Sequence, residues 1–277
     1  MLLKWAGGKA WLVNNHPYVF HNNESYEKRS LKYKSIKYKR YIDPFVGGGA
    51  VFKYLEPEQS IISDINEELI TFYNCLKTSP EALYEEVIKH FNKHSNTYYY
   101  EVRKTLKKDE LGIAARFLYL NYTCYNGIYR VNQKNEFNVP IGDKKSFHYK
   151  VEDFINNSSK LKNTIIQLQD FRETIGQSKK DDLLYVDPPY TTKSNKLAFT
   201  SYSAKQFSWG DQEDLSLLLN QKNAEGVKII ISNINDKDIR ELYSNSQGWN
   251  HKPIDRANIL AHRPKGKKYK EIIISNI

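Results

Sequence analysis

The run Asp187-Pro188-Pro189-Tyr190 places two hydrogen-bond acceptors beside an aromatic ring. It follows an apolar segment, residues 182–186, that we expect to form a strand. Two prolines cannot continue a central strand, so they fix a rigid turn at its carboxyl end, where α/β sheets hold ligands. The turn would aim the Asp187 carboxylate and the Pro188 carbonyl outward, with Tyr190 beside them. This arrangement suits an amino group on a planar ring, although a Pro-Pro pair could also simply stop a strand.

A glycine-rich turn, Asp43-Pro44-Phe45-Val46-Gly47-Gly48-Gly49, follows an earlier predicted strand and opens a helix. Glycines there let the backbone turn sharply and let a ligand approach the main chain. The next predicted strand ends at Asp64, which is placed to accept hydrogen bonds from ribose hydroxyls. A plain tight turn and an N-cap role for Asp64 are the alternatives. The glycine spacing is not G-x-G-x-x-G, so a nucleoside without phosphates fits better than a dinucleotide.

These motifs lie in a chain whose strands and helices alternate on either side of a helical, loop-rich middle. Strands are predicted at 41–42, 60–64, 164–168, 182–186, 227–232 and 271–276. Helices are predicted at 81–91, 111–122 and 211–221, and residues 123–150 are predicted to be loops. Strands alternating with helices indicate an α/β fold with a parallel sheet. The middle segment interrupts it as an inserted module at about residues 76–160.

The net charge of the 277-residue chain is 42 − 32 = +10. This excess suits a polyanionic partner, most simply nucleic acid, although a lysine-rich composition alone would give the same sum. Two basic runs, Lys28 to Arg40 and Arg263 to Lys270, contain tyrosines between their charges. They are either solvated loops or surfaces that contact phosphates and stack on bases.

Other features narrow the class of protein. Two cysteines cannot build a disulfide framework or a four-cysteine zinc site, and they fit a reducing cytoplasm, where we expect the protein. No apolar stretch approaches eighteen residues, so no membrane-spanning helix is expected. Met1 to Ala10 lacks the long apolar run of a secretory signal. His90 and His94 lack the glutamate of a His-Glu-x-x-His motif, and no metal is expected.

Five segments together resemble the Dam-like family of DNA adenine methylases, which use S-adenosylmethionine. In chain order they are Leu3 to Lys9, Asp43 to Gly49, Ser63 to Asn66, Tyr125 to Pro140 and Asp187 to Tyr190. The resemblance implies a Rossmann-like class I methyltransferase fold with an inserted, mainly helical DNA-recognition module. Residues 1–75 and 161–277 would form the cofactor-binding catalytic domain, and residues 76–160 the target-recognition module.

The resemblance also implies roles for single residues. The residues expected at the adenine amino group are Asp187, Pro188 and Tyr190. Those expected at S-adenosylmethionine are Trp5, Lys9, Phe45, Gly47, Asp64, Asp170, Phe171 and Asp187. Those expected at the target bases of double-stranded DNA are Lys4, Tyr125, Asn126, Ile128, Arg130 and Pro140. The pattern breaks after Pro140, where Gly142-Asp143-Lys144-Lys145 replaces the Gly-Arg-Tyr stretch of many members.

The chemistry implied is methyl transfer to the exocyclic nitrogen of adenine, with the base flipped out of the duplex. The nitrogen would attack the methyl group directly, so neither cysteine is needed as a nucleophile. The stretch from Tyr125 to Pro140 is similar to that of GATC-specific members, and we expect that site. A companion restriction endonuclease acting on the same site is compatible with this function. Methyl transfer to RNA or protein, and DNA binding without catalysis, are the competing hypotheses.

Overall fold

A computed structural model describes residues 2–5, 7–21, 36–132, 134, 136–193, 207–255 and 270–277. Residues 28–35 and 263–269, which carry most of the two basic runs, lie outside the described residues. The chain divides into two compact units. The described residues of the first lie within 2–14 and 46–170, and those of the second within 15–45, 171–193, 207–255 and 270–277.

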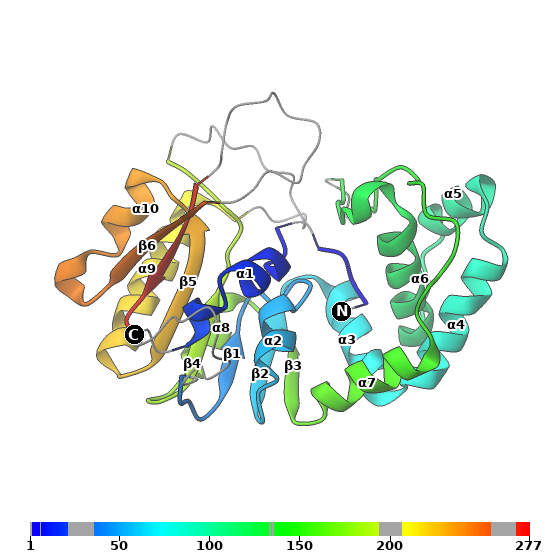
Figure 1. Ribbon diagram of the computed structural model, residues 1–277. Coiled ribbons are helices and arrows are strands. Elements are labelled where there is room, and N and C mark those ends of the chain that lie inside the picture. Colours follow the sequence, from blue (N-terminus) through cyan, green and yellow to red (C-terminus); the bar gives the residue numbers. More distant parts are fainter. Residues whose placement is uncertain are drawn as a thin grey trace. The chain divides into compact units, whose positions relative to one another are not determined.

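The first unit combines a parallel strand pair with a group of helices (Figure 1). Strand β2 (Ser60–Asp64) pairs in parallel with β3 (Thr164–Leu168). The helices are most of α1 (Ala10–Asn15), α2 (Ala50–Leu55), α3 (Glu67–Thr78), α4 (Pro80–Asn92), α5 (Asn96–Lys104), α6 (Glu110–Thr123) and α7 (Val151–Leu161). Helix α6 is buried along most of its length and packs against α3, α4 and α5.

Side-chain caps explain where several of these helices begin. Asp109 precedes α6, and its carboxylate accepts a hydrogen bond from the Gly112 amide at 2.7 Å. Ser95 caps α5 in the same way through the Tyr98 amide. Each cap satisfies an amide that has no partner within the helix. The 3-10 turn η2 (Tyr125–Gly127) follows α6 directly.

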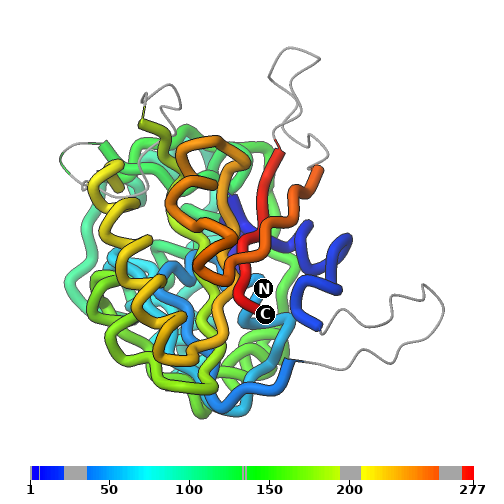
Figure 2. The backbone as a smooth tube through the Cα atoms, turned by 90° about the vertical axis from the view of Figure 1, so that its left-hand side faces the viewer, coloured from blue at the N-terminus to red at the C-terminus, as the bar shows by residue number. Residues whose placement is uncertain are grey.

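The second unit contains a five-strand sheet in the order β1-β4-β5-β7-β6. Strands β1 (Tyr41–Asp43), β4 (Leu183–Val186) and β5 (Lys228–Ile234) are parallel. Strand β7 (Lys270–Ser275) runs antiparallel to β5, and β6 (Asn250–Asp255) runs antiparallel to β7 (Figure 2). Three helices and two 3-10 turns complete this unit: α8 (Phe171–Gly176), α9 (Trp209–Ala224), α10 (Lys237–Leu242), η1 (Pro17–Phe20) and η3 (Asn245–Gln247).

The predicted Rossmann-like α/β fold is confirmed. Every strand and helix predicted from the sequence is present within a few residues of its predicted bounds. The extents given to the catalytic domain and the inserted module stay predictions. Within the described residues, no helix is both long enough and apolar enough to cross a membrane.

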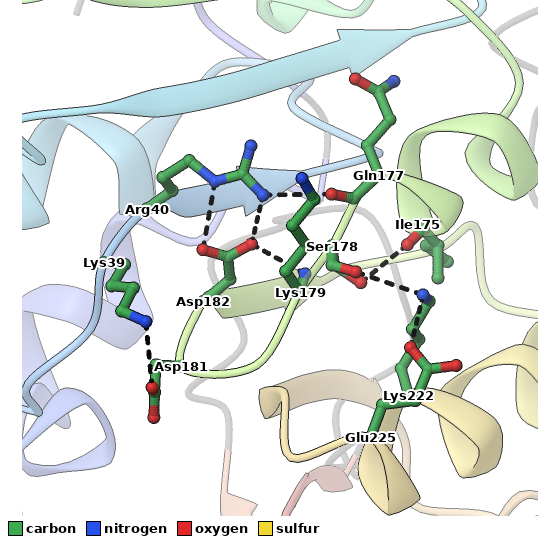
Figure 3. A network of polar contacts seen from close by, with 10 residues as sticks. All are labelled: Lys39, Arg40, Ile175, Gln177, Ser178, Lys179, Asp181, Asp182, Lys222 and Glu225. Carbon is green, nitrogen blue, oxygen red and sulfur yellow. Dashed lines mark hydrogen bonds and ion pairs between the residues drawn. The ribbon is translucent and has the colours of Figure 1, made fainter.

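An ion pair at the amino ends of β1 and β4 fixes these two strands against each other (Figure 3). The Arg40 Nε donates to Asp182 Oδ1 at 3.1 Å, and Nη2 donates to Oδ2 at 2.5 Å. A backbone hydrogen bond from Leu183 to Arg40, 2.8 Å long, lies beside the pair. Bidentate guanidinium–carboxylate pairs constrain both distance and orientation. The opposite ends of the two strands, which carry Asp43 and Asp187, are therefore held in register.

Candidate functional site

The Asp-Pro-Pro-Tyr run lies at the carboxyl end of β4, as predicted. All four residues of β4 are buried. Asp187 and Tyr190 are half-buried, Pro188 is buried and Pro189 is exposed. Tyr190 donates its phenol hydrogen to Glu271 Oε2 at 2.8 Å. The three residues predicted to act on an amino group thus occupy one short segment after a rigid strand.

The surroundings of this segment are acidic and rich in phenols. Burial, and after it the charges of Asp187 and Asp43, raise the pKa of Tyr185 well above its usual value. Burial and the neighbouring Asp43 do the same to the pKa of Tyr41, whose hydroxyl donates to Asp43 at 2.8 Å. The phenols therefore stay neutral. The buried Tyr185 hydroxyl has no hydrogen-bond partner among the residues that the structure describes.

An aromatic cluster in the second unit contains Phe45, from the start of the glycine-rich run. Asp43 Oδ1 accepts a hydrogen bond from the Phe45 amide at 3.1 Å, which shapes the start of the turn. The Phe45 ring stacks on Phe171, with centroids 5.4 Å apart, and meets Phe207 edge-on at 5.8 Å. The structure thus brings together Phe45 and Phe171, both predicted cofactor residues. No sequence motif indicated Phe207, which completes this cluster.

The first unit brings together Trp5, Gly47 and Asp64. Gly47 has a φ of +45°, and a Cβ there would lie 2.7 Å from the Trp5 ring. Only glycine allows both this conformation and this approach. The Gly47 amide donates to Asp64 Oδ2 at 3.2 Å. Trp5 also stacks on Tyr129, with ring centroids 5.5 Å apart.

Asp64 is not a helix cap. Asn66 caps α3 instead, through a 3.0 Å hydrogen bond from the Leu69 amide. Asp64 Oδ1 accepts a hydrogen bond from the Asn66 amide at 3.0 Å. Desolvation raises the Asp64 pKa to about 6. The backbone hydrogen bonds to the carboxylate act in the opposite direction and lower the pKa. A carboxylate has about four acceptor positions, so the backbone donors Asn66, Gly47 and Ile65 leave capacity for a ligand hydroxyl.

The remaining predicted cofactor residues lie at different places. Lys9 is 4% exposed, and its ammonium donates to the Gly7 carbonyl at 2.8 Å. A buried ammonium is costly unless it is paired, and the Gly7 carbonyl supplies one such acceptor. Asp170 is half-buried and follows β3 in the first unit.

The predicted DNA-contacting segment is built on the end of α6. Asn126 is exposed with a φ of +55°, and Gly127 follows with a φ of +64°. A Cβ at Gly127 would lie 2.6 Å from the Lys4 side chain, so Lys4 lies directly against this turn. The side chain of Asn121 fixes the backbone of Lys4. Its Oδ1 accepts a hydrogen bond from the Lys4 amide at 3.0 Å, and its Nδ2 donates to the Lys4 carbonyl at 2.7 Å. Asn121 is a further positioning residue that no sequence motif indicated.

Residues 130–140, the second half of this segment, form a loop whose two sides are joined by hydrogen bonds. Arg130 Nε donates to Asn138 Oδ1 at 2.8 Å, and the Asn138 amide donates to the Arg130 carbonyl at 3.1 Å. The Tyr125 amide donates to the Pro140 carbonyl at 2.9 Å. The exposed or half-buried side chains of the loop therefore have a fixed backbone beneath them. Among them are the predicted DNA contacts Tyr125, Asn126, Ile128, Arg130 and Pro140.

Lys144 belongs to the run Gly142 to Lys145, where the family pattern breaks. Its ammonium lies 3.8 Å from the centroid of the Tyr122 ring. Desolvation, and then the charge of Lys4, lower the Lys144 pKa. Two lysines thus lie near each other beside the loop, an arrangement that favours a phosphate.

The two cysteines are buried and unreactive. Both are free thiols, and burial raises the Cys124 pKa to about 12. A thiol with this pKa is almost wholly protonated at neutral pH and is a poor nucleophile. Among the described residues, no group of three or more His, Cys, Asp or Glu side chains could hold a metal ion.

Comparisons with known proteins cover nearly the whole chain. Residues 5–258 match the model of the D12 class N6 adenine-specific DNA methyltransferase family. The type II methyltransferase M1.LlaDCHI of Lactococcus lactis subsp. cremoris is 34% identical over 99% of this chain and 94% of its own length. The type II methyltransferase M.MjaIII of Methanocaldococcus jannaschii is 36% identical over 99% of this chain and 98% of its own. The DNA adenine methylase of Haemophilus influenzae is 32% identical over 98% and 91%.

Proposed function

The chain belongs to the D12 class family of N6 adenine-specific DNA methyltransferases, and on that premise we propose the residues and steps by which it acts. The proposed reaction methylates the exocyclic nitrogen of adenine within GATC in duplex DNA. The observation that carries the chemistry is the position of Asp187 and Pro188 at the carboxyl end of the buried strand β4. Family membership favours this reaction over methylation of RNA or protein and over DNA binding alone.

The residues around the glycine turn fit the methyl donor that a methyltransferase family implies, S-adenosylmethionine. When bound, this donor would supply an electrophilic methyl group on a sulfonium, whose carbon–sulfur bond breaks to release a neutral thioether as the methyl group is transferred. Gly47 lets the Trp5 ring lie directly against its backbone, and the Asp64 carboxylate has capacity for a ribose hydroxyl. The proposed cofactor-binding residues are Trp5, Lys9, Phe45, Gly47, Asp64, Asp170, Phe171 and Asp187.

The chain's own contribution to the chemistry is to prepare the amino group. The adenine amino nitrogen is a poor nucleophile because its lone pair is delocalised into the ring. The Asp187 carboxylate and the Pro188 carbonyl accept its two hydrogens, which favours a pyramidal nitrogen with an available lone pair. They also stabilise the positive charge as it develops. Tyr190 stacks on the base, and no covalent bond to the enzyme is formed.

The target base must leave the duplex to reach this segment. Asn126 and Ile128, on the turn after α6, fill the space that the flipped base vacates. Arg130 donates bidentately to a guanine of the site. The flipped base and its neighbours would be contacted by Lys4, Tyr125, Asn126, Ile128, Arg130 and Pro140. The proposal includes a cytoplasmic location and a companion restriction endonuclease that acts on the same site.

Restriction protection tests this proposal. Plasmid DNA methylated by the protein should resist an endonuclease that methylation of GATC blocks, and sequencing of the modified bases should locate 6-methyladenine in GATC. Asp187→Ala protein, prepared in parallel, should leave the plasmid sensitive. If 6-methyladenine appears in a motif other than GATC, the proposed site is wrong, whereas unmodified adenine throughout would reject the reaction itself.

A further inference from the structure

We propose that Glu271 is a positioning residue for methyl transfer: its carboxylate accepts the phenol hydrogen of Tyr190 and holds the ring in the orientation that stacks on the target adenine. This inference rests on the proposed function, because it takes Tyr190 as the stacking ring. Neither the glycine turn nor the Asp-Pro-Pro-Tyr run includes Glu271, which lies in the last strand of the chain.

The phenol end of Tyr190 is the point at which the ring is held. Its hydroxyl oxygen lies 2.8 Å from Glu271 Oε2, a contact between residues 81 positions apart. Tyr190 itself belongs to no strand or helix. A ring on such a segment can turn about two side-chain torsions, and fixing it costs conformational entropy. A hydrogen bond at the far end of the ring removes that freedom before the substrate binds.

Glu271 is a suitable anchor because its own backbone is fixed from both sides. Strand β7 lies between β5 and β6, and Glu271 is paired with Ile234 on one side and with Ile254 on the other. Its side chain is only 2% exposed. The acceptor atom is therefore at a defined point of the sheet, while the donor lies on the less regular segment after β4.

A carboxylate at this position is costly for a purely structural strand. The next three residues of β7, Ile272 to Ile274, are buried and apolar, and glutamate is rarely buried unless it is paired. Tyr190 supplies such a partner. Burial, and then the charges of Asp187 and Glu271, raise the Tyr190 pKa well above its usual value. The phenol therefore keeps its proton and remains the donor at every working pH.

The test compares Glu271→Ala with Glu271→Gln in single-turnover methylation of a GATC duplex. We expect the alanine variant to be slower by on the order of 10- to 100-fold, since small misplacements of aligned groups have effects of this size. Affinities for S-adenosylmethionine and for DNA should change less than about twofold. The glutamine variant should regain most of the rate, because its amide oxygen still accepts the phenol hydrogen.

Ile273→Val is the matched control. Ile273 is a buried residue of the same strand, so this variant perturbs the packing of β7 while leaving both partners of the hydrogen bond in place. It should methylate at the wild-type rate. If Ile273→Val loses as much activity as Glu271→Ala, the effect of Glu271 is general destabilisation and the proposal is wrong.

A double-mutant cycle with Tyr190→Phe tests whether Glu271 acts through the phenol. In the Tyr190→Phe background, Glu271→Ala should slow methylation less than about twofold further, and the two changes should also be non-additive in thermal unfolding. Additive effects in either measurement overturn the proposal, as does a wild-type rate in Glu271→Ala. Thermal unfolding reports on the contact without activity, so an inactive wild-type chain would reject the proposed function separately.

Discussion

Asp64 should make cofactor binding depend on pH between 5 and 7. Its pKa is about 6 in the protein, raised from 3.8 mainly by desolvation. Ribose hydroxyls form their strongest hydrogen bonds to Asp64 when its carboxylate is ionised. About nine-tenths of Asp64 is ionised at pH 7 and about one-tenth at pH 5. Because apparent affinity scales with the competent fraction, S-adenosylmethionine binding should weaken roughly tenfold between these pH values.

Titration calorimetry at half-unit steps of pH measures this dependence directly. Asp64→Asn should bind about tenfold or more weakly at pH 7. The amide keeps only one of the two acceptor oxygens, so one ribose hydroxyl loses its partner at a cost of about 1–3 kcal/mol. Its affinity should be flat from pH 5 to 7, since the titrating group is gone. A wild-type affinity that is equally flat, or a sloping profile in Asp64→Asn, would refute the role given to Asp64.

The same shift predicts the direction of a stability change in the unliganded protein. The folded-state pKa of Asp64 lies above the unfolded value, so the folded state binds the proton more tightly. The resulting stabilisation is full below pH 3.8 and is lost as the pH rises through about 6. The folded and unfolded pKa values differ by 6 − 3.8 = 2.2, which corresponds to a loss of about 3 kcal/mol in unfolding free energy. Denaturant unfolding of wild type and of Asp64→Asn should be measured from pH 4 to 7. The difference in unfolding free energy between the two proteins should change with pH by this amount.

Three other substitutions separate chemistry, base recognition and phosphate binding. Asp187→Ala should lower the single-turnover rate by orders of magnitude while gel-shift affinity for DNA persists; a near-normal rate contradicts the mechanism. Arg130→Ala should cost about 1–3 kcal/mol and relax the choice at one base pair in methylation of single-base variants of the site; full discrimination at every base would exclude Arg130 as a reader. Lys144→Ala should weaken all duplexes alike and reduce the salt slope of binding by about 1; an unchanged slope removes Lys144 from the phosphate contacts.

Sequence patterns predicted the ends of the strands well, but they did not predict the contacts between residues that are distant in the chain. Asp64 and Asp187 follow short apolar runs, and strand polarity alone places them at a carboxyl edge. Glu271 had no such signal, because its role depends on a contact with Tyr190 across 81 positions. Asn121 and Lys4, 117 positions apart, are a second example. Local pattern cannot reveal a partner that only the folded chain brings near.

Two elements show how packing overrides local preference. Helix α5 contains three consecutive tyrosines, Tyr98 to Tyr100, and aromatic residues favour strands. A serine cap at its start and packing of Tyr99 in the core against α6 make it a helix instead. Strand β6 contains Pro253 and is mostly exposed, so it lacks the apolar alternation by which strands are predicted. It forms because it is the outer partner of β7, where a proline is tolerated.

Under the proposed function, the choice of base would be divided between two parts of the protein. The segment after β4 would provide acceptors, because Asp187 and the Pro188 carbonyl cannot donate and the raised pKa values of Tyr41 and Tyr185 keep those phenols neutral. A carbonyl oxygen on the base, such as O6 of guanine or O4 of thymine, would meet these acceptors with like charge, and leaving them unpaired is costly. An amino group would instead satisfy both. This segment would therefore select the chemical class of the flipped base, and the loop that carries Arg130 would have only to select its neighbours.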